Sequence, residues 1–243
     1  MENKSTEKVY AVILAGGVGS RMGNQEKPKQ YIELGSKPII IHTIEKFFVM
    51  DEFTKILVLC PKQWIRLTQD LVKKHIPDPE KIEVIQGGET RNETILHAID
   101  YIEEMYGLTE SDIIVTHDAV RPFVTHRIIQ DNISETRKTG ACDTVIPASD
   151  TIVCSDDGKF VTSIPDRREM YQGQTPQSFH AKRLKKIYSE LTENEKAILT
   201  DAAKIMTLKG ERVGIVEGEV FNIKITYPFD VLVAHSLLGG LND

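Results

Sequence analysis

Short apolar runs alternate along this chain with longer segments in which apolar residues recur every three or four positions. The short runs have the length of buried strands, and they predict strands at residues 9–14, 55–59, 82–85, 112–116 and 144–146. This alternation is typical of strand-helix-strand units, which build a mostly parallel sheet flanked by helices. The pattern therefore predicts an α/β fold of the Rossmann-like type.

Helix signals lie between the predicted strands. The segment "ETILHAIDYIEEMYG" carries one apolar stripe, and Gly107 can end the helix; the stripe consists of Ile95, Ile99, Ile102 and Met105. Pro38 suits the first position of a helix through Phe48, and Thr125 can cap a helix through Thr136. These positions predict where the helices begin and end.

After Pro147 the pattern changes to a weak alternation that is interrupted by "DDGK", a typical hairpin turn, and followed by a polar loop. This segment, at about 148–175, predicts an arm that protrudes from the sheet. Further on, the pattern predicts helices at 181–191 and 200–208, strands near 213–216 and 222–226, and a last helix after Pro228. No linker divides the chain, so we expect residues 1–243 to form a single domain that includes the arm.

The composition of the chain excludes several classes of function. The formal net charge is −6 and argues against binding a nucleic-acid backbone, which needs a basic face. The start "MENKSTEKVY" lacks the apolar core of a signal peptide, and no run is long enough to span a membrane, which predicts a cytoplasmic protein. The three cysteines are widely spaced and suggest neither a disulfide framework nor a zinc site.

The first strand leaves through "LAGGVGSRMG", in which Gly16 and Gly17 open a glycine-rich segment. Such glycines allow backbone N–H groups to approach a phosphate, although a simple tight turn would explain them equally well. The spacing is neither the dinucleotide fingerprint nor a Walker A loop. Arg21 lies inside the segment, and Lys27 and Lys29 follow it in "KPKQY", so three cations accompany the glycines. This set favours a polyphosphate ligand.

Two further motifs follow predicted strands. "HDAVRP" contains Asp118 and Arg121, and it should reach the same edge of the sheet as the glycine segment, because ligands bind beyond the carboxyl ends of parallel strands. At that edge, Asp118 could bind Mg²⁺ beside phosphates. Alternatively, Asp118 caps the following turn and pairs with Arg121. "QGGETRNET" opens a helix, and its Arg91 and Thr94 could reach a sugar or phosphate, although a capped helix start explains it as well. "NIKIT" adds Lys224 and is a weak signal alone.

Taken in order and at these separations, "LAGGVGSRMG", "PKQY", "GGETRNET", "HDAVRP", "DRREMYQGQTPQSF" and "NIKIT" resemble the cytidylyltransferase family that includes the methylerythritol phosphate enzyme of isoprenoid synthesis. Within that family the chain is most similar to the group of ribitol-5-phosphate cytidylyltransferases of teichoic acid synthesis. The resemblance implies CTP and a sugar-alcohol phosphate as substrates, Mg²⁺ as cofactor, and a homodimer whose arm crosses to the other subunit.

The resemblance also assigns roles to residues. It implies that Arg21 and Lys29 are catalytic, and that Arg167, Lys224 and Arg121 position the sugar phosphate, with Arg167 acting in the neighbouring subunit. It places Asp118 at the metal and also among the CTP-binding residues, which are Leu14, Ala15, Gly16, Gly17, Gly87, Gly88, Arg91, Thr94, Asp118 and Ala119. An ionised acceptor phosphate can attack the α-phosphorus of CTP directly, so this chemistry requires no protein nucleophile.

The sequence leaves alternatives open for the acceptor substrate and for the class of protein. The sequence Ala15-Gly16-Gly17, "MYQGQTPQSF" and "HDAVRPF" resemble the ribitol group, whereas the isoprenoid enzymes usually have Ala-Ala-Gly in the first segment. The alternative acceptor is 2-C-methyl-D-erythritol 4-phosphate. A regulatory protein that senses CTP without turning it over is the alternative from another class, and a NAD-dependent oxidoreductase is disfavoured by the glycine spacing.

Overall fold

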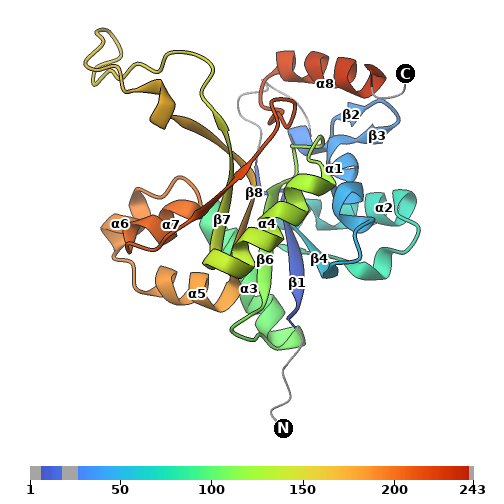
Figure 1. Ribbon diagram of the computed structural model, residues 1–243. Coiled ribbons are helices and arrows are strands. Elements are labelled where there is room, and N and C mark those ends of the chain that lie inside the picture. The colour runs from blue at the N-terminus through green and yellow to red at the C-terminus, as the bar shows by residue number, and fades with distance from the viewer. Residues whose placement is uncertain (1–6, 18–26, 241–243) are drawn as a thin grey trace.

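A seven-stranded mixed sheet forms the centre of the computed structural model, which describes residues 7–17 and 27–240 (Figure 1). The strand order is β5-β4-β1-β6-β8-β7-β9, and β8 pairs antiparallel with both neighbours while the other pairings are parallel. This confirms the predicted α/β fold. The strands are β1 (Val9–Leu14), β4 (Phe53–Cys60), β5 (Ile82–Gln86), β6 (Ile113–Asp118), β7 (Ala141–Pro147), β8 (Tyr171–His180) and β9 (Gly214–Glu217), with a small hairpin of β2 (Glu33–Leu34) and β3 (Lys37–Pro38).

Helices cover both faces of the sheet. One face packs against α1, α2 and α4, and the other against α3, α5 and α7, while α8 lies across a separate small core near β2 (Figure 1). The helices are α1 (Ile39–Phe48), α2 (Ile65–His75), α3 (Arg91–Tyr106), α4 (His126–Thr139), α5 (Ala181–Ser189), α6 (Glu193–Ala197), α7 (Ala203–Leu208) and α8 (Pro228–Gly240). Short 3-10 turns occupy Lys29–Tyr31, Lys62–Trp64, Pro79–Lys81 and Arg167–Glu169. Within the described ranges no helix has the length and apolarity needed to cross a bilayer.

The central position of strand β1 in the sheet explains why its sequence is apolar at nearly every position. Val9, Ala11 and Ile13 belong to the core under α1, α2 and α4, whereas Tyr10 and Val12 belong to the core under α3 and α5. Successive side chains of a strand point to opposite faces, and a central parallel strand is covered on both. A continuous apolar run is therefore required here instead of an alternating one.

Helix ends follow the predicted signals closely. The Thr125 hydroxyl accepts a hydrogen bond from the backbone N–H of Ile128 and caps α4, which ends at Gly140 with a left-handed φ of 84°. Thr90 and Glu93 form a reciprocal capping box at the start of α3, and Gly107 follows its last residue. These caps satisfy backbone groups that would otherwise have no partner at the helix ends.

Two predictions about the second half of the chain are wrong. The arm is predicted to extend to about residue 175, with no strand after it, yet Tyr171–His180 forms β8 inside the sheet. Its polar residues Gln174, Thr175 and Gln177 are buried and hydrogen-bonded, so the strand carries no apolar alternation that could reveal it. Residues 222–226 are predicted to form a strand, but they are irregular: Asn222 and Thr226 bond to side chains, and the N–H of Ile225 donates to the carbonyl of Val120, in place of a strand ladder.

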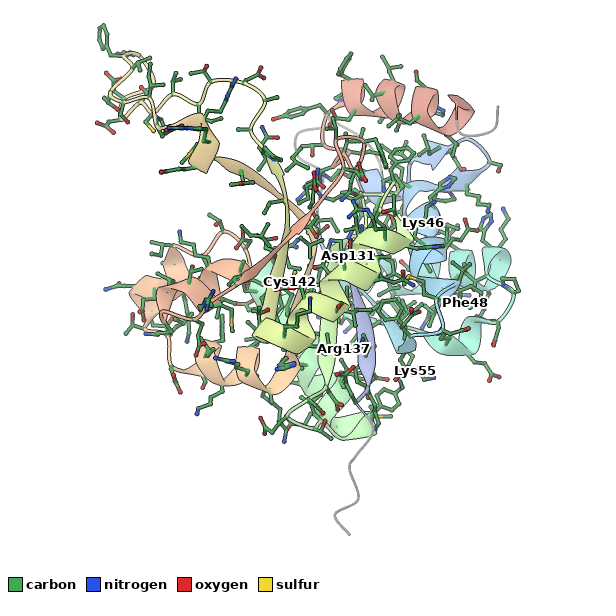
Figure 2. All side chains as sticks on the ribbon, in the orientation of Figure 1. Lys46, Phe48, Lys55, Asp131, Arg137 and Cys142 are labelled. Carbon is green, nitrogen blue, oxygen red and sulfur yellow. The ribbon has the colours of Figure 1, made fainter. Side chains whose placement is uncertain are left out.

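The arm leaves the sheet after β7 and returns into β8 (Figure 1). Its tip turns at Gly158, and the backbone of Cys154 and Ser163 forms an isolated antiparallel bridge, in agreement with the turn predicted at "DDGK". Side chains project from the loop on all visible sides (Figure 2), and large apolar ones are exposed, including Phe160 and Ile164. The arm thus contributes little to the core of its own chain.

Candidate active site

A cavity of about 450 Å³ lies where β1 and β6 end, at the carboxyl edge of the parallel strands. Its size is that of a small-molecule site, and its position is the usual one for ligands of open α/β sheets. Most of the predicted site residues line it, joined by several that were not predicted. The lining consists of Leu14, Ala15, Gly16, Gly17, Lys29, Gln30, Gly88, Glu89, Thr90, Arg91, Thr94, Asp118, Ala119, Val120, Lys224 and Thr226.

The beginning of the glycine segment is fixed by hydrogen bonds on both sides. The N–H of Ala15 donates to the carbonyl of Leu59 at 2.8 Å, and the Ala15 carbonyl accepts from Gln30 Nε2 at 2.7 Å. A Cβ atom added at Gly17 would meet no described atom within 4 Å, so glycine is not required there by packing against the described residues. Gly17 thus leaves space on the cavity side. Arg21, the second predicted catalytic residue, lies outside the described residues.

Lys29 is presented to the cavity by a rigid 3-10 turn. The turn follows Pro28 and is anchored by Tyr31, whose ring packs 5.3 Å from that of Trp64 and whose hydroxyl lies 2.8 Å from Thr68 Oγ1. Only 7% of Lys29 is exposed. The neighbouring Lys27 is exposed and does not line the cavity. The structure therefore separates two lysines that the sequence placed together.

The start of α3 forms the opposite wall. Thr94 Oγ1 accepts from the N–H of Gly88 at 3.0 Å and donates to the carbonyl of Thr90 at 2.8 Å. A Cβ atom at Gly88 would lie 2.5 Å from the Glu93 Cβ, so only glycine allows this close approach. Gly87 does not line the cavity, but it packs against Thr94. The positive end of a helix dipole lies at this wall and would favour an anion.

Asp118 is surrounded by three cations. Its Oδ1 accepts from Arg91 Nη1, and its Oδ2 lies 2.9 Å from Lys224 Nζ and 3.5 Å from Arg121 Nε. The carboxylate side chain is 7% exposed, whereas that of Lys224 is 39% exposed. Three positive charges against one negative charge leave the cluster with a net positive charge. An anionic ligand would be attracted to such a cluster.

Burial and charge together set the ionisation of this region. Burial by itself would raise the pKa of Asp118, but Arg91, Lys224 and Arg121 overcome that effect and hold its pKa well below its usual range. Burial lowers the pKa of His117 to about 4, so the ring is neutral at physiological pH. Burial raises the pKa of Asp143 to about 6, although Gln177 Nε2 donates to its Oδ1 at 3.0 Å. Asp118 is therefore the ionised carboxylate at the centre.

The arm residue Arg167 does not line the cavity in its own chain. Its Nη1 donates to the carbonyl of Ser149 at 3.0 Å, within the arm. Arg121 also lies outside the lining, and it contacts Asp118, which does line the cavity. The residues that sequence reasoning missed are Gln30, Glu89, Thr90, Val120 and Thr226. All five lie within the motifs "KPKQY", "QGGETRNET", "HDAVRP" and "NIKIT", so their proximity to the predicted site residues was the available signal.

The residues do not fit a resident metal ion. Both oxygens of Asp118 already contact cations, and the part of the chain that the structure describes contains no group of three or more His, Cys, Asp or Glu side chains placed to hold a metal. Mg²⁺ could bind Asp118 directly only by displacing an ion pair. The metal role of Asp118 stays a prediction.

The geometry can be compared with known proteins. A family model described as IspD, 2-C-methyl-D-erythritol 4-phosphate cytidylyltransferase, matches residues 9–240. The solved 4-diphosphocytidyl-2C-methyl-D-erythritol synthase of Anaerococcus prevotii is 27% identical, with a TM-score of 0.78 and 96% of each chain covered. The 2-C-methyl-D-erythritol 4-phosphate cytidylyltransferase of Francisella tularensis is 29% identical, with a TM-score of 0.76, and the match covers 95% of this chain and 99% of that chain. The chain therefore belongs to the IspD family of cytidylyltransferases, which are nucleotidyltransferase enzymes.

Proposed function

We propose that this enzyme transfers CMP from CTP to D-ribitol 5-phosphate, giving CDP-ribitol and pyrophosphate for teichoic acid synthesis. A phosphate oxygen of the acceptor attacks the α-phosphorus of CTP and forms a new P–O bond. The bond from the α-phosphorus to the oxygen that bridges to the β-phosphate breaks, and pyrophosphate leaves with the electron pair. The acceptor phosphate is largely dianionic at neutral pH, because its second pKa is about 6.

The observation that carries the proposal is the cation cluster around Asp118, which shares one cavity with Lys29 and with residues 14–17, the start of the glycine segment. Two polyanions repel each other, so a catalyst for this reaction must neutralise charge while it aligns the attacking and leaving oxygens. Lys224 is partly exposed and can reach a phosphate. Lys29, which lies near the other end of the sequence, lines the same cavity. The described residues supply this chemistry without a nucleophilic Ser, Cys or His.

Mg²⁺ enters this proposal as part of the substrate, MgCTP. In such a complex the ion is bound mainly by phosphate oxygens and water, which agrees with its usual ligand preference. The ion pairs of Asp118 then remain intact when the nucleotide binds. We accordingly expect the Mg²⁺ concentration needed for full activity to rise with the CTP concentration.

The acceptor is the finer part of the proposal. Ala15-Gly16-Gly17 and the segments "HDAVRPF" and "MYQGQTPQSF" support ribitol 5-phosphate by their resemblance to that group. The family model and the solved relatives carry the name of the methylerythritol phosphate enzyme, which makes 2-C-methyl-D-erythritol 4-phosphate the second candidate. Both acceptors are short polyols with one terminal phosphate, so the cation cluster suits either one.

A homodimer is also part of the proposal. The arm exposes Phe160, Val161 and Ile164, each more than half accessible, and its Arg167 does not reach the cavity of its own chain. Clusters of exposed apolar side chains favour contact with another protein surface. An arm that packs on a second subunit would bury these side chains and could bring Arg167 to that subunit's cavity.

A pyrophosphate-release assay with MgCTP tests the function. Ribitol 5-phosphate, ribulose 5-phosphate and 2-C-methyl-D-erythritol 4-phosphate are supplied in parallel at equal concentration, and UTP and ATP replace CTP in control reactions. We expect release with CTP and the highest kcat/KM with ribitol 5-phosphate. A higher kcat/KM with the methylerythritol acceptor would select the second candidate, and CTP binding without release for any acceptor would contradict the transfer reaction.

A further inference from the structure

Behind the cavity, side-chain hydrogen bonds join three segments that are far apart in the sequence. They are the end of β6, the middle of β8, and the irregular stretch between β9 and α8 that carries Lys224. The residue at the centre of this network is Asn222, which is fully buried and does not line the cavity. The motif "NIKIT" thus contains a second polar residue with a defined place in the fold.

Asn222 connects the strand layer to two of the three cations of the cluster, Arg121 and Lys224. Its Nδ2 donates to Gln174 Oε1 at 3.0 Å and to the carbonyl of Thr175 at 2.9 Å. Its backbone carbonyl accepts from Arg121 Nη1 at 2.7 Å. Lys224, two residues further on, reaches Asp118 at 2.9 Å. One residue therefore ties β8 to the guanidinium of Arg121 and to the segment that carries Lys224.

Gln174 is itself held in place on both sides. Its Nε2 donates to the carbonyl of Glu219 at 2.8 Å, and its Oε1 accepts from Asn222. A Cβ atom at Gly218 would lie 2.4 Å from that Oε1, so the chain passes close enough to fix the amide. The amide orientation of Asn222 follows, because its donors face two oxygen acceptors.

A directional chain of hydrogen bonds supports the other side of Arg121. The N–H of Asp118 donates to Thr175 Oγ1 at 3.2 Å, and Thr175 Oγ1 lies 3.0 Å from His117 Nδ1. His117 Nε2 lies 3.0 Å from the carbonyl of Arg121, which can only accept, so the ring proton resides on Nε2 and Thr175 donates to Nδ1. The backbone of Asp118 and Arg121 is thereby fixed against β8.

We propose, resting on the proposed function, that Asn222 is a positioning residue that holds Arg121 and Lys224 at Asp118 and so sets the affinity for the acceptor phosphate. The three cations around Asp118 repel one another, and free side chains would separate into solvent. Hydrogen bonds from a fixed frame keep them together before a ligand arrives. Such preorganisation raises affinity, because the ordering cost is met during folding.

A purely structural role explains Asn222 less well. Its Oδ1 is buried and has no hydrogen-bond partner among the described residues, which costs stability. Asn132 offers the contrast, because it is equally buried, but its Nδ2 donates to Ile128 and Thr144 while its Oδ1 accepts from Ser178. Asn132 lies on α4 away from the cavity lining. It is the matched control.

The test compares Asn222→Ala with Asn132→Ala. For each variant we measure the melting temperature, the KM for the acceptor, the KM for CTP, and the Kd for inorganic phosphate, the probe for the acceptor phosphate, by calorimetry. We expect Asn222→Ala to raise the acceptor KM and the inorganic phosphate Kd by about tenfold, the effect of losing one or two buried hydrogen bonds behind the cations. We expect the CTP KM to change much less, and Asn132→Ala to lower only the melting temperature.

A second variant covers the case in which Asn222→Ala does not fold. Gln174→Met keeps the side-chain size, removes one acceptor of Asn222, and should shift the same two constants in the same direction. Unchanged acceptor KM and inorganic phosphate Kd in the folded variants would overturn the inference while the transfer reaction stands. Absence of turnover in the unmodified enzyme would overturn the proposed function, and the inorganic phosphate titration would still decide the role of Asn222.

Discussion

Replacing Asp118 with Asn removes one negative charge from the centre of three cations and leaves the side-chain shape nearly unchanged. The carboxylate is 7% exposed and contacts Arg91, Lys224 and Arg121. Removing one partner of a buried ion pair costs about 3–5 kcal/mol, because the remaining charges lose their counter-ion. Lys224 and Arg91 stay partly hydrated, which places the cost near the lower value. We expect the Asp118→Asn variant to melt about 6–12 °C lower, at about 2–4 °C per kcal/mol for a chain of this size.

The pH dependence has a defined sign. The cations hold the pKa of Asp118 well below its usual range, so its contribution to stability is present above the unfolded pKa of about 3.9 and is lost as the pH falls through the folded pKa. The difference in melting temperature between the two proteins should therefore be constant from about pH 6 to 8. It should narrow below about pH 4, where Asp118 of the unfolded wild-type chain binds a proton while the folded carboxylate is still ionised.

Scanning calorimetry at several pH values measures this effect. Asp131→Asn is the matched control, because Asp131 also forms an ion pair, with Arg127 at 3.0 Å, but lies half exposed on α4 (Figure 2). Exposed ion pairs are worth about 0–1 kcal/mol, so this control should melt within a few degrees of the wild type. Equal melting temperatures for the two variants at pH 7 would refute the central role of Asp118 in the cation cluster.

Three further predictions concern other residues. Lys29→Ala should lower kcat at least about a hundredfold with the fold retained, the usual cost of losing a donor to developing charge, whereas Lys27→Ala should not; near-normal turnover of Lys29→Ala would remove Lys29 from the mechanism. Arg167→Ala should raise the KM for the sugar phosphate more than the KM for CTP, and an equal rise in both would contradict its assigned role. Asp143→Asn should stabilise the protein at pH 7.5 by about 1–3 kcal/mol, since burial raises the pKa of Asp143 to about 6 and folding therefore disfavours the ionised form. That gain should disappear below about pH 4, and a pH-independent difference in unfolding free energy would argue against the raised pKa.

Apolar patterning and local capping chemistry predicted much of the fold. Strand β1 appears within its predicted bounds because a strand covered on both faces must be apolar throughout, and helix α4 follows the cap at Thr125. Strand β8 escaped prediction because its buried residues are polar and find partners on other segments. Residues 222–226 had the alternation of a strand, but their hydrogen bonds go to side chains and to Val120 instead of a neighbouring strand.

The sequence by itself determined the parts of this protein that depend on neighbours along the chain: most strands and helices, with β8 as the exception, the glycine segment, and the motifs that identify the family. Only the tertiary structure decided which cations share one carboxylate, because Arg91, Arg121 and Lys224 reach Asp118 from three separate segments. It also separated Lys29, in the cavity, from Lys27, on the surface, and it placed Asn222 behind the cluster. Charge interactions and hydrogen bonds depend on distance in space, and that distance is set by the packing of the whole chain.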